Sequence, residues 1–331
     1  MNITIIGAGA WGTALAISLS AHHRVTLWAR DADQIAAMRA ARNNQQYLPG
    51  IELPVAVQLS ADFPAALAAA ELAIIAVPTA GLRQALQRLV ALPRHFDVVW
   101  LCKGFEADTA KLPHQVVAEV LPAGFRSGVL SGPSFAQEVA QGFPTALTLA
   151  SADADFARST AQALHHAYLR IYPSNDLAGV EVGGAVKNVM AIAAGISDGL
   201  GLGLNARAAL LTRGLAEITR LGLNLGGRSE TLSGLSGVGD LILTCTGDLS
   251  RNRQVGLLLV QQHDLPEILR RLGHVAEGVN TVREVHHLAQ RLGVAMPICD
   301  AVYRILYERI PPAEMVATLL NRAPNLEFDG G

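Results

Sequence analysis

Residues 3–16 read ITIIGAGAWGTALA, an apolar run that passes through three glycines into an alanine-rich segment. The glycines stand at positions 7, 9 and 12, which is the GxGxxG spacing of a turn between a buried strand and a helix. Gly7 permits the tight bend, Gly9 lets backbone N–H groups approach a pyrophosphate, and Gly12 lets helix and strand pack closely. The order strand, turn, helix favours a dinucleotide site over a merely flexible turn.

Strand-like and helical segments alternate from this turn onward. We expect strands at residues 2–6, 24–28, 55–59, 72–77, 97–101, 128–130, 145–149 and 169–172. This alternation is typical of a doubly wound α/β sheet. Beyond residue 176 we expect only helices, at residues 183–199, 206–221, 251–262, 278–292 and 312–321. We therefore predict a Rossmann-type domain over residues 1–180, an all-α substrate domain over 181–322 and a mobile tail over 323–331.

Composition narrows the class of protein. The 331 residues are 50% hydrophobic and 16% charged, with a formal net charge of −2 and no large basic cluster. That argues against nucleic acid as a partner. The apolar run at 189–196 is much shorter than the roughly 20 residues that cross a membrane, and the N-terminus lacks a basic leader, so we expect a cytoplasmic protein without a membrane span. Three cysteines without CxxC spacing predict reduced thiols, with neither disulfide nor metal.

Two stretches follow expected strands at the ligand-binding edge of the sheet. Lys103-Gly104 comes after the strand at 97–101, where a ligand-binding lysine and a solvated loop lysine are both possible. Ser134 and Gln137 have the spacing of a capping box, which predicts that Ser134 caps a helix. With Gly132 beside it, that helix N-terminus also suits an anionic or hydroxylated ligand.

Lys187 stands in a helix that is otherwise apolar on every face except for Asn188. A lysine is almost never buried without a partner, because removing its ammonium from water costs several kcal/mol and lowers its pKa. Lys187 is therefore our candidate for acid–base chemistry, with a structural salt bridge as the alternative. Asp240 lies at a glycine-flanked bend and is a possible partner for Lys187, or else a helix cap.

Ser250, Arg251 and Asn252 open another helix with a hydroxyl, a guanidinium and an amide. Such a helix N-terminus holds a phosphate well. Ordinary capping with surface arginines explains the same residues, so the sequence leaves both interpretations open.

Together these motifs resemble the NAD(P)-dependent sn-glycerol-3-phosphate dehydrogenases, the biosynthetic soluble enzymes of bacteria, over nearly the whole chain. The matching motifs are GAGAWGTALA at 7–16, KG at 103–104, SGPSFA at 131–136, GGAVKNV at 183–189, NARA at 205–208, GDLILTCT at 239–246, SRN at 250–252 and EG at 277–278.

The resemblance implies a role for each matching residue. Lys187 corresponds to the catalytic acid–base, and Lys103 to a residue that touches both cofactor and substrate, with Asp240 and Thr244 orienting Lys187. The implied glycerol-phosphate contacts are Lys103, Gly132, Ser134, Lys187, Asp240, Ser250, Arg251 and Asn252. The implied cofactor contacts are Gly7, Gly9, Ala10, Trp11, Gly12, Arg30, Lys103, Ala136, Arg251, Val275 and Glu277.

The implied reaction is the reduction of dihydroxyacetone phosphate to sn-glycerol 3-phosphate with NAD(P)H, for glycerophospholipid synthesis. Arg30 stands first after the second strand, ahead of Asp31, and favours the 2′-phosphate of NADPH, with NADH also used. Such enzymes are commonly homodimers. The alternatives are a Rossmann reductase of a carboxylate substrate, which would lack the Ser250–Asn252 arrangement, and a non-catalytic NAD(P)H sensor, which would not require Lys187.

Overall fold

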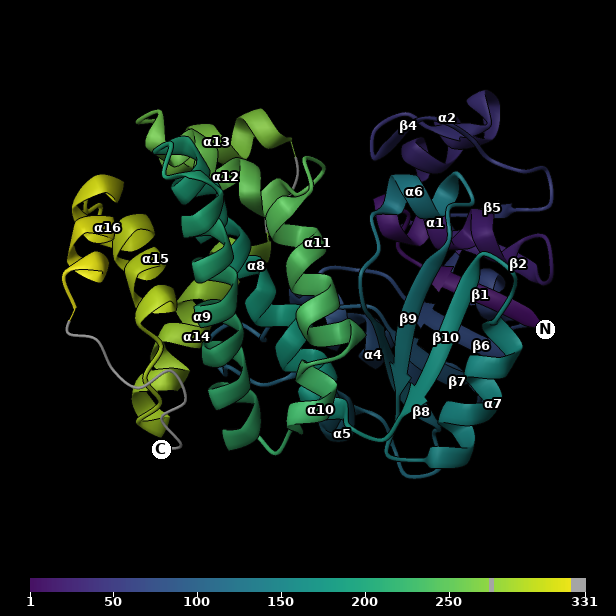
Figure 1. The fold of residues 1–331 in the computed structure, drawn as a ribbon. Helices are drawn as coiled ribbons and strands as arrows, with labels where there is room; N and C mark the ends of the chain where they lie inside the picture. The colour runs from purple at the N-terminus through teal and green to yellow at the C-terminus, as the bar shows by residue number, and fades with distance from the viewer. Residues whose placement is uncertain (274–276, 323–331) are drawn as a thin grey trace.

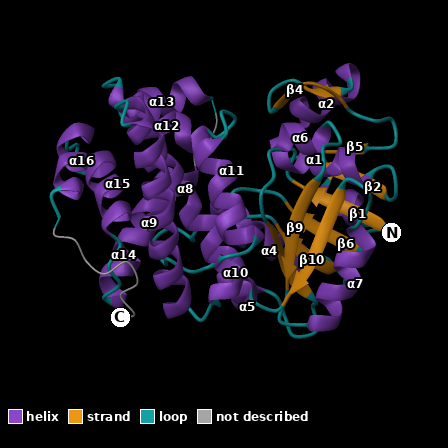
Figure 2. Ribbon diagram, viewed as in Figure 1, coloured by secondary structure: helices purple, strands orange, loops and turns teal. Residues whose placement is uncertain are grey.

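The computed structural model describes residues 1–273 and 277–322. A sheet flanked by helices forms the N-terminal part, to the right in Figure 1, and a bundle of helices forms the C-terminal part, to the left. Figure 2 shows the same division between strands and helices. The predicted class, a Rossmann-type α/β sheet followed by an all-α domain, is confirmed for the described residues.

The main sheet has eight strands in the order β10-β9-β8-β7-β6-β1-β2-β5. The strands are β1 (Asn2–Ile6), β2 (Arg24–Trp28), β5 (Gln58–Ser60), β6 (Leu72–Ile75), β7 (Asp97–Trp100), β8 (Ser127–Ser131), β9 (Thr145–Ala150) and β10 (Leu169–Ser174). Neighbouring strands are parallel except β8 and β9. In β1, Ile3 pairs with Val25 on one side and with Leu72 on the other, so this strand lies at the centre.

Both faces of the sheet are buried, as parallel sheets require. Ile3 and Ile5 join one apolar cluster, and Ile6 joins the other. The covering helices are α1 (Ala10–Leu19), α2 (Ala32–Ala41), α3 (Phe63–Leu67), η1 (Thr79–Gly81), α4 (Leu82–Val90), α5 (Pro113–Val120), α6 (Ala136–Ala140) and α7 (Ala154–Leu164).

One expected strand is partly wrong. Residues 55–57 form a turn, in which the N–H of Val57 donates to the carbonyl of Pro54 at 2.9 Å, and the strand β5 begins only at Gln58. Immediately before that turn, β3 (Asn43–Asn44) and β4 (Leu48–Glu52) form a small antiparallel pair that the sequence analysis did not anticipate. Val55 is 90% exposed, which explains why its β propensity did not place it in the sheet.

The C-terminal domain is built around α8 (Leu177–Gly199), which is buried from Gly179 to Ser197. This helix is long and apolar enough to cross a membrane, but 89% of its apolar window is buried within the protein, as in the core helix of a globular domain. The helices around it are α9 (Gly203–Asn224), α10 (Ser229–Leu232), η2 (Leu235–Gly239), α11 (Asp240–Thr246), α12 (Arg251–Val260), α13 (Leu265–Leu272), α14 (Glu277–Leu292), α15 (Pro297–Tyr307) and α16 (Pro312–Leu320).

The predicted domain boundary at residue 180 falls inside α8, and we propose that the division lies just before this helix. The tail at 323–331, expected to be mobile, lies outside the described residues. Because α8 follows β10 directly, the chain enters the helical domain beside the sheet.

Candidate active site

Lys187 and Asp240 form a buried ion pair between α8 and α11. The Nζ of Lys187 donates to Oδ1 of Asp240 and, at 2.9 Å, to Oγ1 of Thr244. Asp240 and Thr244 are four residues apart, so both lie on one face of α11. Lys187 is 6% exposed and Asp240 is 1% exposed. The pairing of Lys187 with Asp240 anticipated from the sequence is thus present.

A glycine allows α8 to approach closely enough for this pair. A Cβ on Gly183 would lie 2.4 Å from the carbonyl oxygen of Ser236, so the π-type turn η2 runs directly against the α8 backbone. Asp240 follows that turn at once, and Lys187 lies one helical turn beyond Gly183. The small residue therefore fixes where the carboxylate meets the ammonium.

Lys103 reaches the same carboxylate from the N-terminal domain. It follows β7, and its Nζ donates to Oδ2 of Asp240 at 2.8 Å and to the carbonyl of Gly132 at 3.0 Å. Its side chain is 16% exposed, so it is not the solvated loop lysine that the sequence left open. Gly104 next to it has a φ of +150°, a conformation that favours glycine. Asp240 thus joins ammonium groups from both domains.

Electrostatics adapt Lys187 to proton transfer. Burial lowers the pKa of Lys187 to about 8; Asp240 opposes this shift and Lys103, a like charge, adds to it. A group that titrates near neutral pH is suited to act as both proton donor and proton acceptor.

The N-terminus of α12 lies beside this cluster. Ser250 caps α12 by accepting from the N–H of Arg253 at 3.3 Å, as expected. The Arg253 guanidinium is bound to Asp198 and Asp248, so it holds the helix in place. Arg251, the first residue of α12, is exposed. Of Arg251 and Arg253, Arg251 is therefore the one whose guanidinium can turn toward a phosphate.

Asn252 bridges three helices. Its Nδ2 donates to Oδ1 of Asn188 at 3.0 Å, and its Oδ1 accepts from the N–H of Gly278 at 3.1 Å. Asn188 follows Lys187 in α8 and was outside the set of site residues predicted from the sequence. The sequence could have pointed to Asn188, because it is a polar residue next to Lys187 in an otherwise apolar helix.

The predicted capping role of Ser134 is wrong. Helix α6 begins at Ala136, its N-cap residue is Phe135, and no side chain caps it. The hydroxyl of Ser134 donates instead to the carbonyl of Gly132 at 3.0 Å. Since Gly132 has a φ of +136°, its carbonyl can turn toward both Ser134 and Lys103. Ser134 therefore lies at the edge of the lysine cluster rather than at a helix end.

The residues between β1 and α1 fit a dinucleotide. Gly7 has a φ of +118°, and a Cβ on Gly12 would lie 2.0 Å from the Gly7 carbonyl oxygen, so only glycine permits this turn. A Cβ on Gly9 would meet nothing within 4 Å, and no side chain caps α1, which begins at Ala10. The helix N–H groups therefore face open space where a pyrophosphate can bind.

Other predicted cofactor residues lie around this turn. Trp11 and Ala136 pack in one small apolar cluster with Ala14 and Val139. Arg30 is exposed after β2, whereas Asp31 caps α2 by accepting from the N–H groups of Asp33 and Gln34. Both of these hydrogen bonds go to Oδ1 of Asp31, so this oxygen of the carboxylate is used as the cap.

Glu277 connects the helical domain to the sheet edge. Burial raises the pKa of its carboxyl, while a hydrogen bond from the backbone of Thr79 and the charges of Arg251, Lys103 and Lys187 oppose the shift. The hydroxyls of Thr79 and Ser131 are buried here and have no hydrogen-bond partner among the described residues. Val275 lies outside the described residues.

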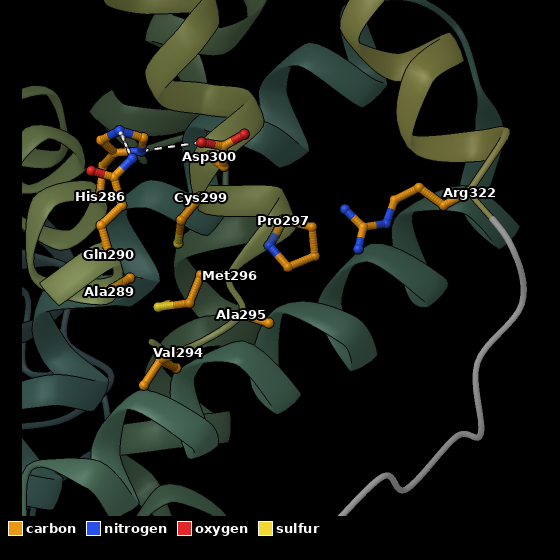
Figure 3. A pocket seen from close by; sticks show the side chains of 10 residues that line it. All are labelled: His286, Ala289, Gln290, Val294, Ala295, Met296, Pro297, Cys299, Asp300 and Arg322. Carbon is orange, nitrogen blue, oxygen red and sulfur yellow. Dashed lines mark hydrogen bonds and ion pairs between the residues drawn. The ribbon is translucent and has the colours of Figure 1, made fainter. Parts of the chain in front are cut away.

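A separate pocket of about 230 Å³ lies on α14 and α15, lined in part by Met296, Pro297 and Arg322 (Figure 3). His286 within it is paired with Asp300 at 3.2 Å and with Gln290 at 3.0 Å. These polar groups are satisfied by one another, so the pocket shows no chemistry like that of the lysine cluster.

Comparison with known proteins identifies what this arrangement resembles. Residues 2–157 match the family model for the N-terminus of NAD-dependent glycerol-3-phosphate dehydrogenase, and residues 176–317 match the model for its C-terminus. Glycerol-3-phosphate dehydrogenase [NAD(P)+] from Nitrosomonas eutropha is 60% identical, and that from Thiobacillus denitrificans is 61% identical, each over 99% of this chain and 100% of the relative. The crystal structure of glycerol-3-phosphate dehydrogenase from Coxiella burnetii is 42% identical, with a TM-score of 0.93 over 97% of this chain and 99% of that one.

Proposed function

Because the chain belongs to the NAD-dependent glycerol-3-phosphate dehydrogenase family, we propose that the cluster of Lys187, Asp240 and Lys103 is the active site at which it reduces dihydroxyacetone phosphate to sn-glycerol 3-phosphate. The enzyme is an NAD(P)-dependent oxidoreductase acting on a CH–OH group. The observation that carries the site assignment is the single carboxylate of Asp240 bound by lysines from both domains.

When bound, the nicotinamide dinucleotide supplies the hydride. Lys187 donates a hydrogen bond to the substrate carbonyl oxygen and then its proton to the alkoxide that forms there. Asp240 and Thr244 hold the Lys187 Nζ by its other hydrogens, so that one N–H remains for the substrate. In the reverse direction neutral Lys187 accepts the proton from the alcohol.

Lys103 has a different role from Lys187. Its ammonium binds Asp240 and Gly132 beside the reacting oxygen, where it stabilises negative charge in the transition state. The proton that moves is thus assigned to Lys187, whose pKa is about 8.

The substrate phosphate binds at the start of α12. Ser250 and the first backbone N–H groups of this helix provide neutral donors, and Arg251 provides the charge. Asn252 stays bonded to Asn188 and Gly278, so it orients this helix end against α8 and α14 and contributes to the phosphate site by position. Gly132 and Ser134 border the glycerol portion next to Lys103.

The dinucleotide binds at the turn from Gly7 to Gly12, with Arg30 beside the adenosine ribose, so that NADPH is favoured and NADH is also accepted. We place the enzyme in the cytoplasm, a location that its three buried, unpaired cysteines fit. Its product is the backbone of glycerophospholipids.

The experiment that tests this function is the loss of nicotinamide absorbance when dihydroxyacetone phosphate is added to the purified protein with NADPH or NADH. Oxidation that depends on the substrate supports the function. Tight binding of NADPH without turnover contradicts it and favours a sensor, whereas turnover with a 2-oxo acid alone favours a reductase of carboxylate substrates.

A further inference from the structure

Glu181 is a buried carboxylate on α8 that lies apart from the lysine cluster. Its side chain has no exposed surface. It accepts from Nε1 of Trp100 at 2.8 Å and from the backbone N–H of His114 at 2.9 Å, and it pairs with Nδ1 of His114 at 2.6 Å. All three donors belong to the N-terminal domain, in β7 and α5. One carboxylate of the helical domain is therefore fastened to two elements of the sheet domain.

Glu181 also serves as the missing cap of α5. The N-cap residue of α5 is Leu112, whose side chain has no acceptor, and the helix begins with Pro113. The carboxylate from α8 takes the N–H of the second residue, where the helix dipole favours negative charge. Burying a carboxylate is costly, and apolar residues often replace a buried ion pair without loss of stability. Stability alone therefore does not account for an acid at this position.

Glu181 and its partner Trp100 each lie a short distance along the chain from one of the two lysines. Trp100 is the last residue of β7 and stands three residues before Lys103, which lies in the segment after the strand. Along α8, Glu181 stands six residues before Lys187, about 9 Å of helix. The two elements meet again at Asp240, which both lysines bind. The end of β7 and the helix α8 are thus connected twice, through Glu181 and through Asp240.

The space between these two joints is tightly packed. A Cβ on Gly184, one turn after Glu181, would lie 2.8 Å from Oγ of Ser131 and 3.5 Å from Cγ of Lys103. The α8 backbone therefore lies directly against the Lys103 side chain. A small rotation of α8 about Asp240 would move the Lys103 stem as well.

We propose that Glu181 is a positioning residue, which through Trp100 and His114 sets the placement of α8 against β7 and so holds Lys103 and Lys187 on the two oxygens of Asp240. This inference rests on the proposed function. Without the Glu181 joint, β7 and α5 lose their hydrogen bonds to α8, and Lys103 moves away from the pair formed by Lys187 and Asp240.

A displacement of Lys103 changes the pKa of Lys187 in a predictable direction. The charged groups facing Lys187 are Asp240 on α11, Lys103 after β7 and Glu277 on α14. Lys103 lowers the pKa of Lys187 by like-charge repulsion, so its withdrawal raises that pKa. A merely structural role for Glu181 does not predict this shift.

Glu217 provides a matched control within the same chain. It is 1% exposed and accepts from the N–H groups of Ile298 and Cys299 at 2.6 and 3.1 Å, capping α15. That helix also begins with a proline, Pro297, after an N-cap residue without an acceptor, Met296. Glu217 is thus a buried capping carboxylate of the same kind, but both of its partners lie within the helical domain.

The test compares Glu181→Gln with Glu217→Gln in the full-length enzyme, with thermal unfolding, NADPH titration by fluorescence and the pH dependence of kcat measured for each. We expect both variants to lose thermal stability. Only Glu181→Gln should lower kcat for dihydroxyacetone phosphate, by roughly ten- to a hundredfold, the effect of misplacing reacting groups by about 1 Å. It should also move the midpoint of the pH profile upward, whereas Glu217→Gln should leave both this midpoint and the Kd for NADPH unchanged.

Equal loss of stability in both variants, with kcat and the pH midpoint unchanged in Glu181→Gln, would overturn the proposal. Should Glu181→Gln fail to fold, His114→Ala removes the side-chain contact to Glu181 and keeps the backbone N–H contact, with less disturbance because His114 is partly exposed. In that variant, too, an unshifted midpoint counts against the proposal and an upward shift supports it. A wild-type enzyme inactive on dihydroxyacetone phosphate would refute the proposed function itself, a result distinct from either outcome for Glu181.

Discussion

Lys103 and Lys187 bind opposite oxygens of one carboxylate, although they lie far apart in the chain and belong to different domains. The position of Lys103 relative to Asp240 and Lys187 therefore depends on how the two domains pack against each other. The arrangement makes acid–base chemistry depend on the contact between domains.

The first prediction concerns pH. Reduction requires the Lys187 ammonium, so kcat for reduction should fall as the pH rises through about 8, the pKa of Lys187. Oxidation of sn-glycerol 3-phosphate requires the neutral amine, so its kcat should rise over the same interval. Steady-state kinetics in both directions test this. Two limbs with the same sign would exclude Lys187 as the shared acid–base group.

The second prediction concerns Asp240→Asn. This change removes the negative charge that raises the pKa of Lys187, so the midpoint of the reduction profile should move to lower pH. It also leaves buried ammonium groups unpaired, which costs about 3–5 kcal/mol of unfolding free energy. Denaturant titration measures the second effect. The control is the double variant Lys187→Ala with Asp240→Asn, which should recover part of that stability; no recovery would argue against the ion pair.

The third prediction concerns Arg251. Arg251→Ala should raise the KM for dihydroxyacetone phosphate about tenfold or more, the worth of a charge-assisted hydrogen bond to phosphate, with a smaller change in kcat. Activity on unphosphorylated dihydroxyacetone should be unaffected. Arg291→Ala at the exposed end of α14 removes the same charge elsewhere and serves as the control. An equal effect of both variants would show a non-specific influence of net charge.

The fourth prediction concerns Arg30. Arg30 is an exposed cation directly after β2, which suits a contact to the 2′-phosphate of the cofactor. Arg30→Ala should weaken NADPH binding about tenfold through loss of a contact to the 2′-phosphate, and leave NADH binding nearly unchanged. Fluorescence titration with each cofactor measures this. A parallel loss for both cofactors would place Arg30 away from the 2′-phosphate.

Local signals in the sequence were enough for much of the site. The strand, turn and helix around Gly7–Gly12 follow from apolar runs and glycine spacing, which are determined within a few residues. Lys187 stood out because a charge in an all-apolar helix requires a partner, and the glycine-flanked bend at Asp240 marked that residue as a possible partner, with a helix cap as the alternative. Each of these inferences depends on short stretches of chain.

Features set by tertiary contact were not predictable in this way. The role of Ser134 was misassigned, because the spacing of a capping box does not reveal that Gly132 turns its carbonyl toward that hydroxyl. The Asn188–Asn252 bond joins residues on different helices, and no local pattern marks it. Glu181 likewise looks like an ordinary helix acid until Trp100 and His114 are placed beside it.

The most direct test of the central claim is the rate of NADPH oxidation by Lys187→Ala with dihydroxyacetone phosphate at saturation, near pH 7. We predict a fall in kcat of at least about 10²-fold, the usual contribution of a general acid, with the Kd for NADPH close to that of the wild type. Turnover near the wild-type rate would contradict the assignment of Lys187 as the proton donor.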